Sequence, residues 1–232
     1  MKYETTLQSI IPSTVDVARF RFIRPKGLDY KPGQFFFVNL YHQGNNLRKP
    51  FSFSSSPTEP DYIEFTKKLS DSKYSATLRA TKPGDWVQID APYGKFTFEG
   101  EYPKIALLAG GIGITPFRSM IKYAIDKSLN SHIILFYSCR TVNDIMFKNE
   151  WEANQKNKHL KVVLIINEAT PNWSGKTGVI DVDLIKQELP DYKEHIFFAC
   201  GPPGMVKSMQ LLIEKLGLSK EQLKLEHFTG YV

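Results

Sequence analysis

The stretch Leu-Ala-Gly-Gly-Ile-Gly-Ile-Thr-Pro-Phe, residues 108–117, joins an apolar strand pattern to a helical pattern through a glycine-rich turn. Because Gly110, Gly111 and Gly113 carry no side chain, the backbone N–H groups of such a turn can approach a diphosphate closely. Pro116 suits the first turn of a helix, where its missing donor costs nothing. A tight corner in any α/β fold has a similar composition. The turn's place as the first strand-to-helix connection in its half of the chain favours a nucleotide site.

From residue 103 onward, apolar strand patterns alternate with helical patterns, which predicts a parallel sheet with helices on both faces. Strands are expected at 104–109, 132–138, 162–167, 195–199 and 224–228, and helices at 116–127, 144–154, 182–188 and 205–216. Cys200, Gly201, Pro202 and Met205 follow one of these strands, at the edge of the sheet where open α/β folds bind ligands. A buried cysteine is most often only a small apolar residue, but the glycine–proline segment after Cys200 favours a binding role.

The first hundred residues have a different pattern, in which short β-branched and aromatic runs are separated by turn signals. Strands are expected at 15–23, 35–41, 62–68 and 86–90, with one helix at 75–81. Strands at this spacing predict an antiparallel barrel or sandwich. The change of pattern near residue 101 predicts two domains, 1–101 and 102–232.

Composition narrows the possible functions. The chain has 232 residues, 42% of them hydrophobic, and a net charge of +6. No basic block or basic helix stripe is present, so the sequence makes no case for nucleic-acid binding. The two cysteines are too few for a four-thiolate iron–sulfur cluster or a disulfide framework, and no metal site is expected. Without an apolar run of membrane-spanning length or a signal-peptide pattern, the expected location is cytoplasmic.

A second stretch, Leu-Arg-Lys-Pro-Phe-Ser-Phe-Ser-Ser-Ser-Pro at 47–57, reads as a strand that presents a basic group, a ring and a hydroxyl. In a regular strand Lys49 and Phe51 lie on one side, and Pro50 and Ser52 on the other. From the pattern alone, a ligand site and a half-buried hairpin strand are equally well supported.

Together these segments resemble the ferredoxin–NADP⁺ reductase superfamily, in which a flavin-binding β-barrel precedes a nucleotide-binding α/β domain. The resemblance covers essentially the whole chain and rests on five ordered motifs. They are residues 49–52, 72–75, 91–94, 110–116 and 200–205.

The resemblance implies roles for individual residues. Phe51 would stack on the flavin ring system and Ser52 would hydrogen-bond near its N5 atom, while Thr115 and Cys200 would lie beside the nicotinamide. Ser52, Cys200 and Glu226 are the implied catalytic residues. The other residues implied in cofactor binding are Lys49, Pro50, Thr66, Lys68, Ser75, Gly110, Gly111, Gly113, Thr115, Pro116, Arg140, Gly201, Pro202, Met205, Phe228 and Tyr231. Either Phe228 or Tyr231 would cover the flavin face.

The chain departs from the family pattern at three points. Lys49 stands where arginine is usual, with Arg48 one position away, and a point charge replaces a bidentate fork. Ser72 replaces a glycine of the phosphate motif. The serine–arginine pair that often holds the 2′-phosphate of NADP is absent, and Glu168 follows the third strand of the α/β half instead. NADH is therefore slightly favoured over NADPH, with Arg140 as the counter-argument.

The expected function is that of a flavoprotein reductase with FAD, transferring hydride from NAD(P)H to FAD and electrons onward to a separate acceptor. The mild basic excess favours an acidic carrier protein of the ferredoxin or flavodoxin type. A free-flavin reductase and an electron-transfer subunit of a larger redox complex are the alternatives.

Overall fold

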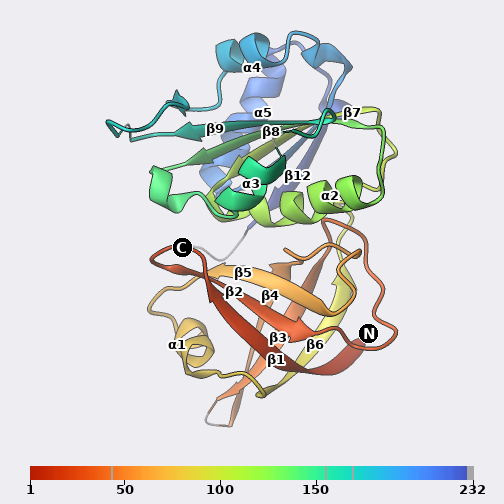
Figure 1. Cartoon of the computed structure of the whole chain (residues 1–232), viewed down its shortest axis with the longest axis vertical. Coiled ribbons are helices and arrows are strands. Elements are labelled where there is room, and N and C mark those ends of the chain that lie inside the picture. Colours follow the sequence, from red (N-terminus) through yellow and green to blue (C-terminus); the bar gives the residue numbers. More distant parts are fainter. Residues whose placement is uncertain (43, 155, 169, 229–232) are drawn as a thin grey trace. The chain divides into compact units, whose positions relative to one another are not determined.

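The computed structural model describes residues 1–42, 44–154, 156–168 and 170–228. They divide into two compact units. The first joins residues 1–99 to residues 115–127, and the second contains the remaining described residues. Each unit is built around its own six-stranded sheet (Figure 1). The predicted order of an antiparallel β half followed by a parallel α/β half is confirmed.

The sheet of the first unit has the strand order β4-β3-β6-β1-β2-β5, with every neighbouring pair antiparallel. Its elements are β1 (Lys2–Pro12), β2 (Val17–Ile23), β3 (Phe35–His42), β4 (Asn45–Ser52), β5 (Tyr62–Lys68), β6 (Trp86–Tyr93) and helix α1 (Lys73–Ala80). Phenylalanines at alternate strand positions fill the interior. The Phe51 ring stacks on Phe65 with centroids 4.2 Å apart, and Phe53 lies between Tyr30 and Phe36 at 3.8 and 4.3 Å. Stacked ring pairs of this kind stabilise the fold by more than the burial of their apolar area alone.

A serine segment, defined here as Ser54, Ser55 and Ser56, connects the two edge strands of this sheet. All three residues are fully buried. The Ser54 N–H donates to the Glu64 carbonyl on β5 at 2.8 Å, and the Ser54 hydroxyl donates to the Glu64 carboxylate at 2.9 Å. Arg21 Nε holds the other carboxylate oxygen at 2.7 Å. The segment therefore links the end of β4 to β5 through a satisfied polar network.

Helix α2 (Ile114–Asp126) begins directly after the glycine turn, and residues 115–127 cluster with the antiparallel sheet. The guanidinium of Arg118 donates to the Ser54 carbonyl at 2.6 Å and to both carboxylate oxygens of Glu59 at 3.0 and 3.2 Å. One residue further on, the Ser119 hydroxyl donates to the Ser55 carbonyl at 2.7 Å. Burial alone would raise the pKa of Glu59, but Arg118 holds that pKa below its usual value.

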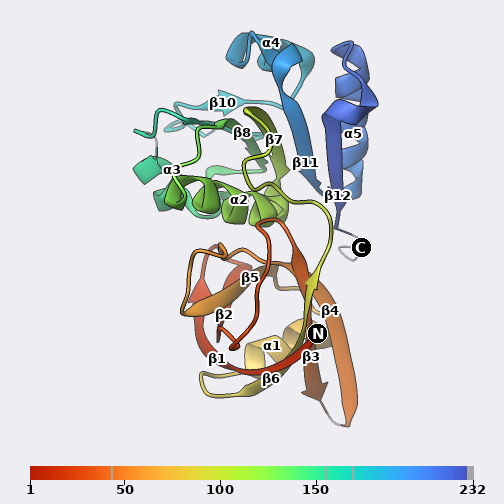
Figure 2. The ribbon, with the colours of Figure 1, turned by 90° about the vertical axis from the view of Figure 1, so that its right-hand side faces the viewer.

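The sheet of the second unit has the order β10-β9-β8-β7-β11-β12, and all its pairs are parallel. Its strands are β7 (Lys104–Gly110), β8 (His132–Cys139), β9 (Leu160–Ile166), β10 (Lys176–Thr177), β11 (Ile196–Gly201) and β12 (Leu223–His227). Its helices are α3 (Lys148–Asn154), α4 (Val182–Glu188) and α5 (Pro203–Lys215). Apolar residues of α4 and α5 pack on one face of the sheet, and Figure 2 shows α5 running alongside β12. No helix in the described part of the chain is long and apolar enough to cross a membrane.

The Arg118 contacts make a direct prediction about stability. Replacing Arg118 by methionine keeps most of the side-chain volume but leaves the Glu59 carboxylate, 12% exposed, without its partner. We expect a loss of about 3 kcal/mol in the free energy of unfolding, measured by urea denaturation, because a buried ion pair broken on one side leaves an uncompensated charge.

The matched control is Lys122→Met on the same helix. Lys122 pairs with Asp126 at 2.5 Å, four residues further on, and its side chain is 36% exposed. A surface pair of this kind contributes about 0.5 kcal/mol. Equal losses for the two variants would contradict the role given to Arg118.

Candidate functional site

In the first unit, strand β4 places one buried hydroxyl without a partner. Ser52 ends the strand opposite Phe35 and is 4% exposed. Its Oγ atom is fully buried and makes no hydrogen bond to any described residue. Burying a hydroxyl without a partner is costly, so such a group in a folded protein points to a missing ligand. This observation fits the hydrogen bond to a flavin that the sequence predicts for Ser52.

The neighbours of Ser52 on β4 lie as the predicted alternation requires. Phe51 points into the interior and stacks on Phe65. Lys49 is half-buried on the same side, while Pro50 is exposed on the other. The described structure therefore supports the alternation; stacking of Phe51 on a flavin stays a prediction.

A cluster of three cations is centred on Lys67, which lies beside Phe51. Lys67, on β5, is 5% exposed, and its Nζ lies 6.0 Å from the centre of the Phe51 ring. Burial lowers the pKa of Lys67 to about 8, and the charges of Lys49 and Arg79 lower it further in the same direction. A bound anion would relieve both the burial cost and the mutual repulsion. The cluster therefore suits the diphosphate of a dinucleotide.

The sequence predicts Lys68 for this role, and its motifs do not single out Lys67 or Arg79. The Lys68 side chain is exposed, and its Nζ lies 3.0 Å from Asp16 Oδ2. The alternation along β5 was the available signal, because it puts Lys67 on the same face as Phe65, two residues away.

The hydroxyls predicted to lie along the phosphates belong to internal networks. Thr66 donates to the Ser54 hydroxyl at 3.0 Å. Ser75 is fully buried, and its hydroxyl accepts from the Ser70 N–H at 3.1 Å. Ser72 caps helix α1 by accepting from the Ser75 N–H. Contacts from Thr66 and Ser75 to a phosphate remain predictions.

In the second unit, two glycines of the turn serve packing within the protein. A Cβ atom on Gly113 would overlap the Cys200 carbonyl, and one on Gly110 would overlap the Met205 sulfur. The 110–113 turn and the 200–205 segment therefore lie in direct contact at the carboxyl edge of the sheet.

Of the other glycines in these segments, Gly201 also packs against protein atoms, whereas Gly111 does not. A Cβ on Gly201 would meet the Met205 sulfur at 2.6 Å. Gly111 differs, because its φ of +50° favours glycine and the space where a Cβ would lie is open. Gly111 is thus the member of the turn whose backbone is open to a diphosphate, and Pro202 beside it in the paired segment is exposed.

Cys200 lies next to Glu226 across the β11–β12 pairing. The thiol is fully buried, and burial, followed by the Glu226 charge, raises its pKa well above the usual value. Burial also raises the pKa of Glu226 to about 7. A protonated thiol is a poor nucleophile. Cys200 is therefore better suited to shaping a binding surface than to covalent catalysis, and Glu226 can hold a proton near neutral pH.

The remaining predicted residues are spread over both units. Thr115 and Pro116 are buried in the first turn of α2. Arg140 and Glu168, which follow β8 and β9, form an exposed ion pair at 2.6 Å. Phe228 is half-buried after β12, and Tyr231 lies outside the described residues.

Comparison with known proteins agrees with this arrangement. Residues 4–98 match the oxidoreductase FAD-binding domain, and residues 107–211 match the oxidoreductase NAD-binding domain. The glycine betaine monooxygenase reductase subunit of Chromohalobacter salexigens is 30% identical over 94% of this chain and 62% of its own length. The NADH-cytochrome b5 reductase 2 of Debaryomyces hansenii is 33% identical over 72% of this chain and 58% of its own. The chain thus spans about three fifths of these relatives.

Solved structures support the fold. The cytochrome b5 reductase domain of Ulva prolifera nitrate reductase has a TM-score of 0.85 at 24% identity, covering 98% of this chain and 97% of that one. The ferredoxin NADP⁺ reductase from Neisseria gonorrhoeae has a TM-score of 0.84 at 21% identity, covering 97% and 98%. The chain therefore belongs to the ferredoxin reductase family of oxidoreductases, with an FAD-binding domain followed by an NAD-binding domain.

Proposed function

We propose that this chain is an NAD(P)H-dependent reductase that binds FAD in its antiparallel unit and passes electrons to a protein acceptor. The observation that carries the proposal is the buried Ser52 hydroxyl without a partner, next in sequence to Phe51 and its three-cation cluster. Bound FAD supplies the redox chemistry, since it takes up hydride and releases electrons singly or in pairs.

The protein's own groups divide the work between affinity and positioning. Lys49, Lys67 and Arg79 supply positive charge for the diphosphate, so they determine how tightly the dinucleotide is held. Ser52 supplies a hydroxyl to the reacting part of the flavin. Its contribution should therefore appear in the rate of reduction more than in affinity.

The relatives suggest what kind of molecule accepts the electrons. The relatives include reductase components of glycine betaine and propane monooxygenases and NADH-cytochrome b5 reductases. Each of these names pairs the reductase with another redox protein. The two cysteines of this chain cannot ligate a four-thiolate iron–sulfur cluster. The electrons therefore pass to a group outside these 232 residues, and we propose a one-electron carrier of the ferredoxin, flavodoxin or cytochrome type.

Ser52→Ala tests the positioning role. We expect hydride transfer from NADH to slow about tenfold, because a hydrogen bond at the reacting centre is lost, while FAD content stays near that of the unmodified protein. Stopped-flow absorbance measures the rate. Ser52→Thr keeps the hydroxyl and should restore most of it. An unchanged rate in the alanine variant would remove Ser52 from the site.

A neighbouring pair of lysines tests the phosphate site. Lys67→Ala should weaken FAD binding at least about tenfold, because charge-assisted contacts to phosphate are strong. Lys68→Ala, which removes an exposed pair with Asp16, should change the affinity less than about twofold. Fluorescence titration of the apoprotein with FAD measures both. The reverse order would restore Lys68 to the predicted role.

The pKa of Lys67 adds a pH dependence to the same experiment. In the FAD-free protein the Lys67 side chain is charged below about pH 8 and neutral above it. FAD affinity should therefore be constant at lower pH and decline as pH rises past 8. The decline should be absent in Lys67→Ala.

The Arg140–Glu168 ion pair tests the choice of nucleotide. We propose a preference for NADH, because Glu168 holds Arg140 at 2.6 Å and would repel a 2′-phosphate. Glu168→Gln should raise kcat/KM for NADPH about tenfold relative to NADH, since it removes the repulsion and releases the guanidinium. A tenfold preference of the unmodified protein for NADPH would overturn the proposal.

A further inference from the structure

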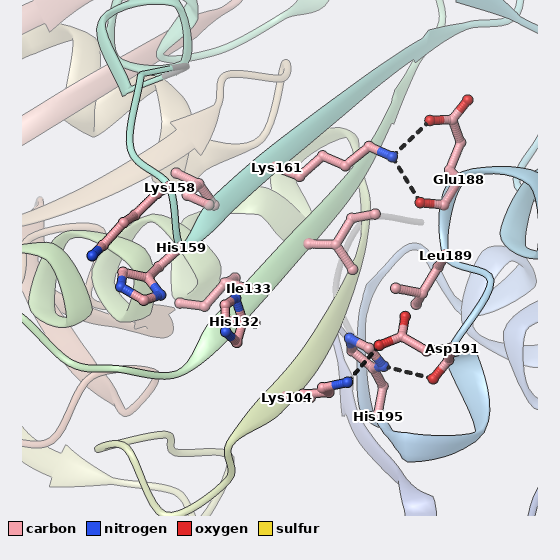
Figure 3. A pocket seen from close by; sticks show the side chains of 12 residues that line it. Lys104, His132, Ile133, Lys158, His159, Lys161, Glu188, Leu189, Asp191 and His195 are labelled. Carbon is pink, nitrogen blue, oxygen red and sulfur yellow. Dashed lines mark hydrogen bonds and ion pairs between the residues drawn. The ribbon is translucent and has the colours of Figure 1, made fainter.

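A pocket of about 330 Å³ opens at the amino edge of the parallel sheet. It lies where β7, β8 and β9 begin and where the chain enters β11 (Figure 3). The glycine turn and the 200–205 segment are at the carboxyl ends of the same strands. Nucleotides in open α/β sheets bind at the carboxyl edge, so this pocket is separate from the proposed NAD site.

Four basic residues form a row across this edge, one for each of four adjacent strands. Lys104 begins β7 and pairs in register with His132, which begins β8. His159 comes just before β9, level with His132, because Leu160 pairs with Ile133. His195 comes just before β11, level with Lys104, because Ile196 pairs with Ile105. Neighbouring strands lie about 4.8 Å apart, and the His132 and His159 rings are 5.0 Å apart.

The acidic side chains of the pocket are already engaged by lysines. Lys104 binds Asp191 at 2.6 Å, and Lys161 binds Glu188 at 3.0 Å, as Figure 3 shows. Lys158 also lines the pocket and forms no ion pair with any described residue. Glu194 also pairs with Lys104, and Lys176 also pairs with Glu188. The charge of Lys158 therefore remains without an acidic partner among the charged groups of the pocket.

His195 places a specific demand on a ligand. The residue is only 4% exposed, and its Nδ1 lies 3.1 Å from the Asp191 carbonyl. A carbonyl only accepts, so Nδ1 carries the proton. In the neutral ring Nε2 is then an acceptor, and Figure 3 shows the second nitrogen directed away from that carbonyl. Burial lowers the pKa of His195, which keeps the ring neutral near pH 7.

A second imidazole, that of His159, has a buried nitrogen without a partner in the described part of the chain. Nδ1 of His159 is buried and makes no hydrogen bond to any described residue. The described residues contain no group of three or more side chains placed to hold a metal ion. The buried Nδ1 of His159 therefore calls for a hydrogen-bonding partner.

We propose that this pocket binds a small oxyanion that still carries a proton near neutral pH, with hydrogen phosphate as the simplest example. The anionic oxygens accept hydrogen bonds from the Lys158 ammonium and from ring N–H groups of His132 and His159. The acidic O–H of the ligand donates to Nε2 of His195. Sulfate has the same size and charge but no proton, so it cannot make the last contact. The inference stands independently of the proposed reductase function.

The test is calorimetric titration of the full chain, with FAD and saturating NAD⁺ present so that phosphate is kept from the dinucleotide sites. Near pH 7.5, where inorganic phosphate mostly retains one proton, phosphate should bind at least about tenfold more tightly than sulfate at equal ionic strength. The ring NMR signals of His132, His159 and His195 should shift with phosphate, and that of His227 should not. Absence of saturable binding, or shifts confined to other residues, would overturn the proposal.

Two variants locate the contacts. His195→Ala should remove the preference for phosphate over sulfate. Lys158→Ala, at an exposed position where folding is not at risk, should weaken both anions about fivefold or more and leave the preference intact. Unchanged phosphate affinity in Lys158→Ala, or an unchanged preference in a folded His195→Ala, would contradict the assignment. Flavin reduction by NADH, measured alongside, reports separately on the reductase function.

Discussion

The guanidinium of Arg118 connects the two stretches of sequence from which the architecture can be deduced. It belongs to the helix that follows the glycine turn, and it binds the Ser54 carbonyl and the Glu59 carboxylate. Ser54 in turn binds Glu64, so the same network links the edge strands β4 and β5 of the antiparallel sheet. Ser52, with its buried free hydroxyl, lies two residues before this network. The position of Ser52, the candidate partner of the flavin, therefore depends on the buried charge of Arg118. That charge is stable in the interior only because all of its polar partners are present.

The glycines of the parallel unit show how one motif combines structure and binding. Gly113 is required because backbone atoms of Cys200 occupy the space of a side chain, whereas at Gly110 and Gly201 the obstructing atom is the sulfur of the flexible Met205 side chain. Gly111 has open space and a positive φ. Only some glycines of such a turn are therefore evidence for a ligand, and the structure is needed to identify them.

Much of the fold could be predicted from the sequence, because hydrophobic periodicity reports directly on which faces are buried. The runs 62–68 and 182–188 coincide with β5 and α4. The long strand β1 was not predicted, since its alternation mixes polar and apolar residues. The helix expected at 144–154 is shorter, Lys148–Asn154, because Val142–Asp144 forms a separate 3₁₀ turn.

Candidate site residues can be found in the sequence where a motif contains them, but not where only the register of the strands brings them together. Ser52, Cys200 and Gly111 came from motifs. Lys67 required knowing which face of β5 meets Phe51. The row of basic residues at the amino edge joins positions up to 91 apart, from 104 to 195, and no local pattern relates them.

The most direct measurement is an anaerobic absorbance experiment on the purified chain with its bound cofactor. We expect a yellow protein whose flavin band bleaches on stoichiometric addition of NADH and returns on addition of an oxidised one-electron carrier protein. A colourless protein that takes up no FAD, or a bound flavin that NADH and NADPH both fail to bleach, would contradict the proposed reductase function.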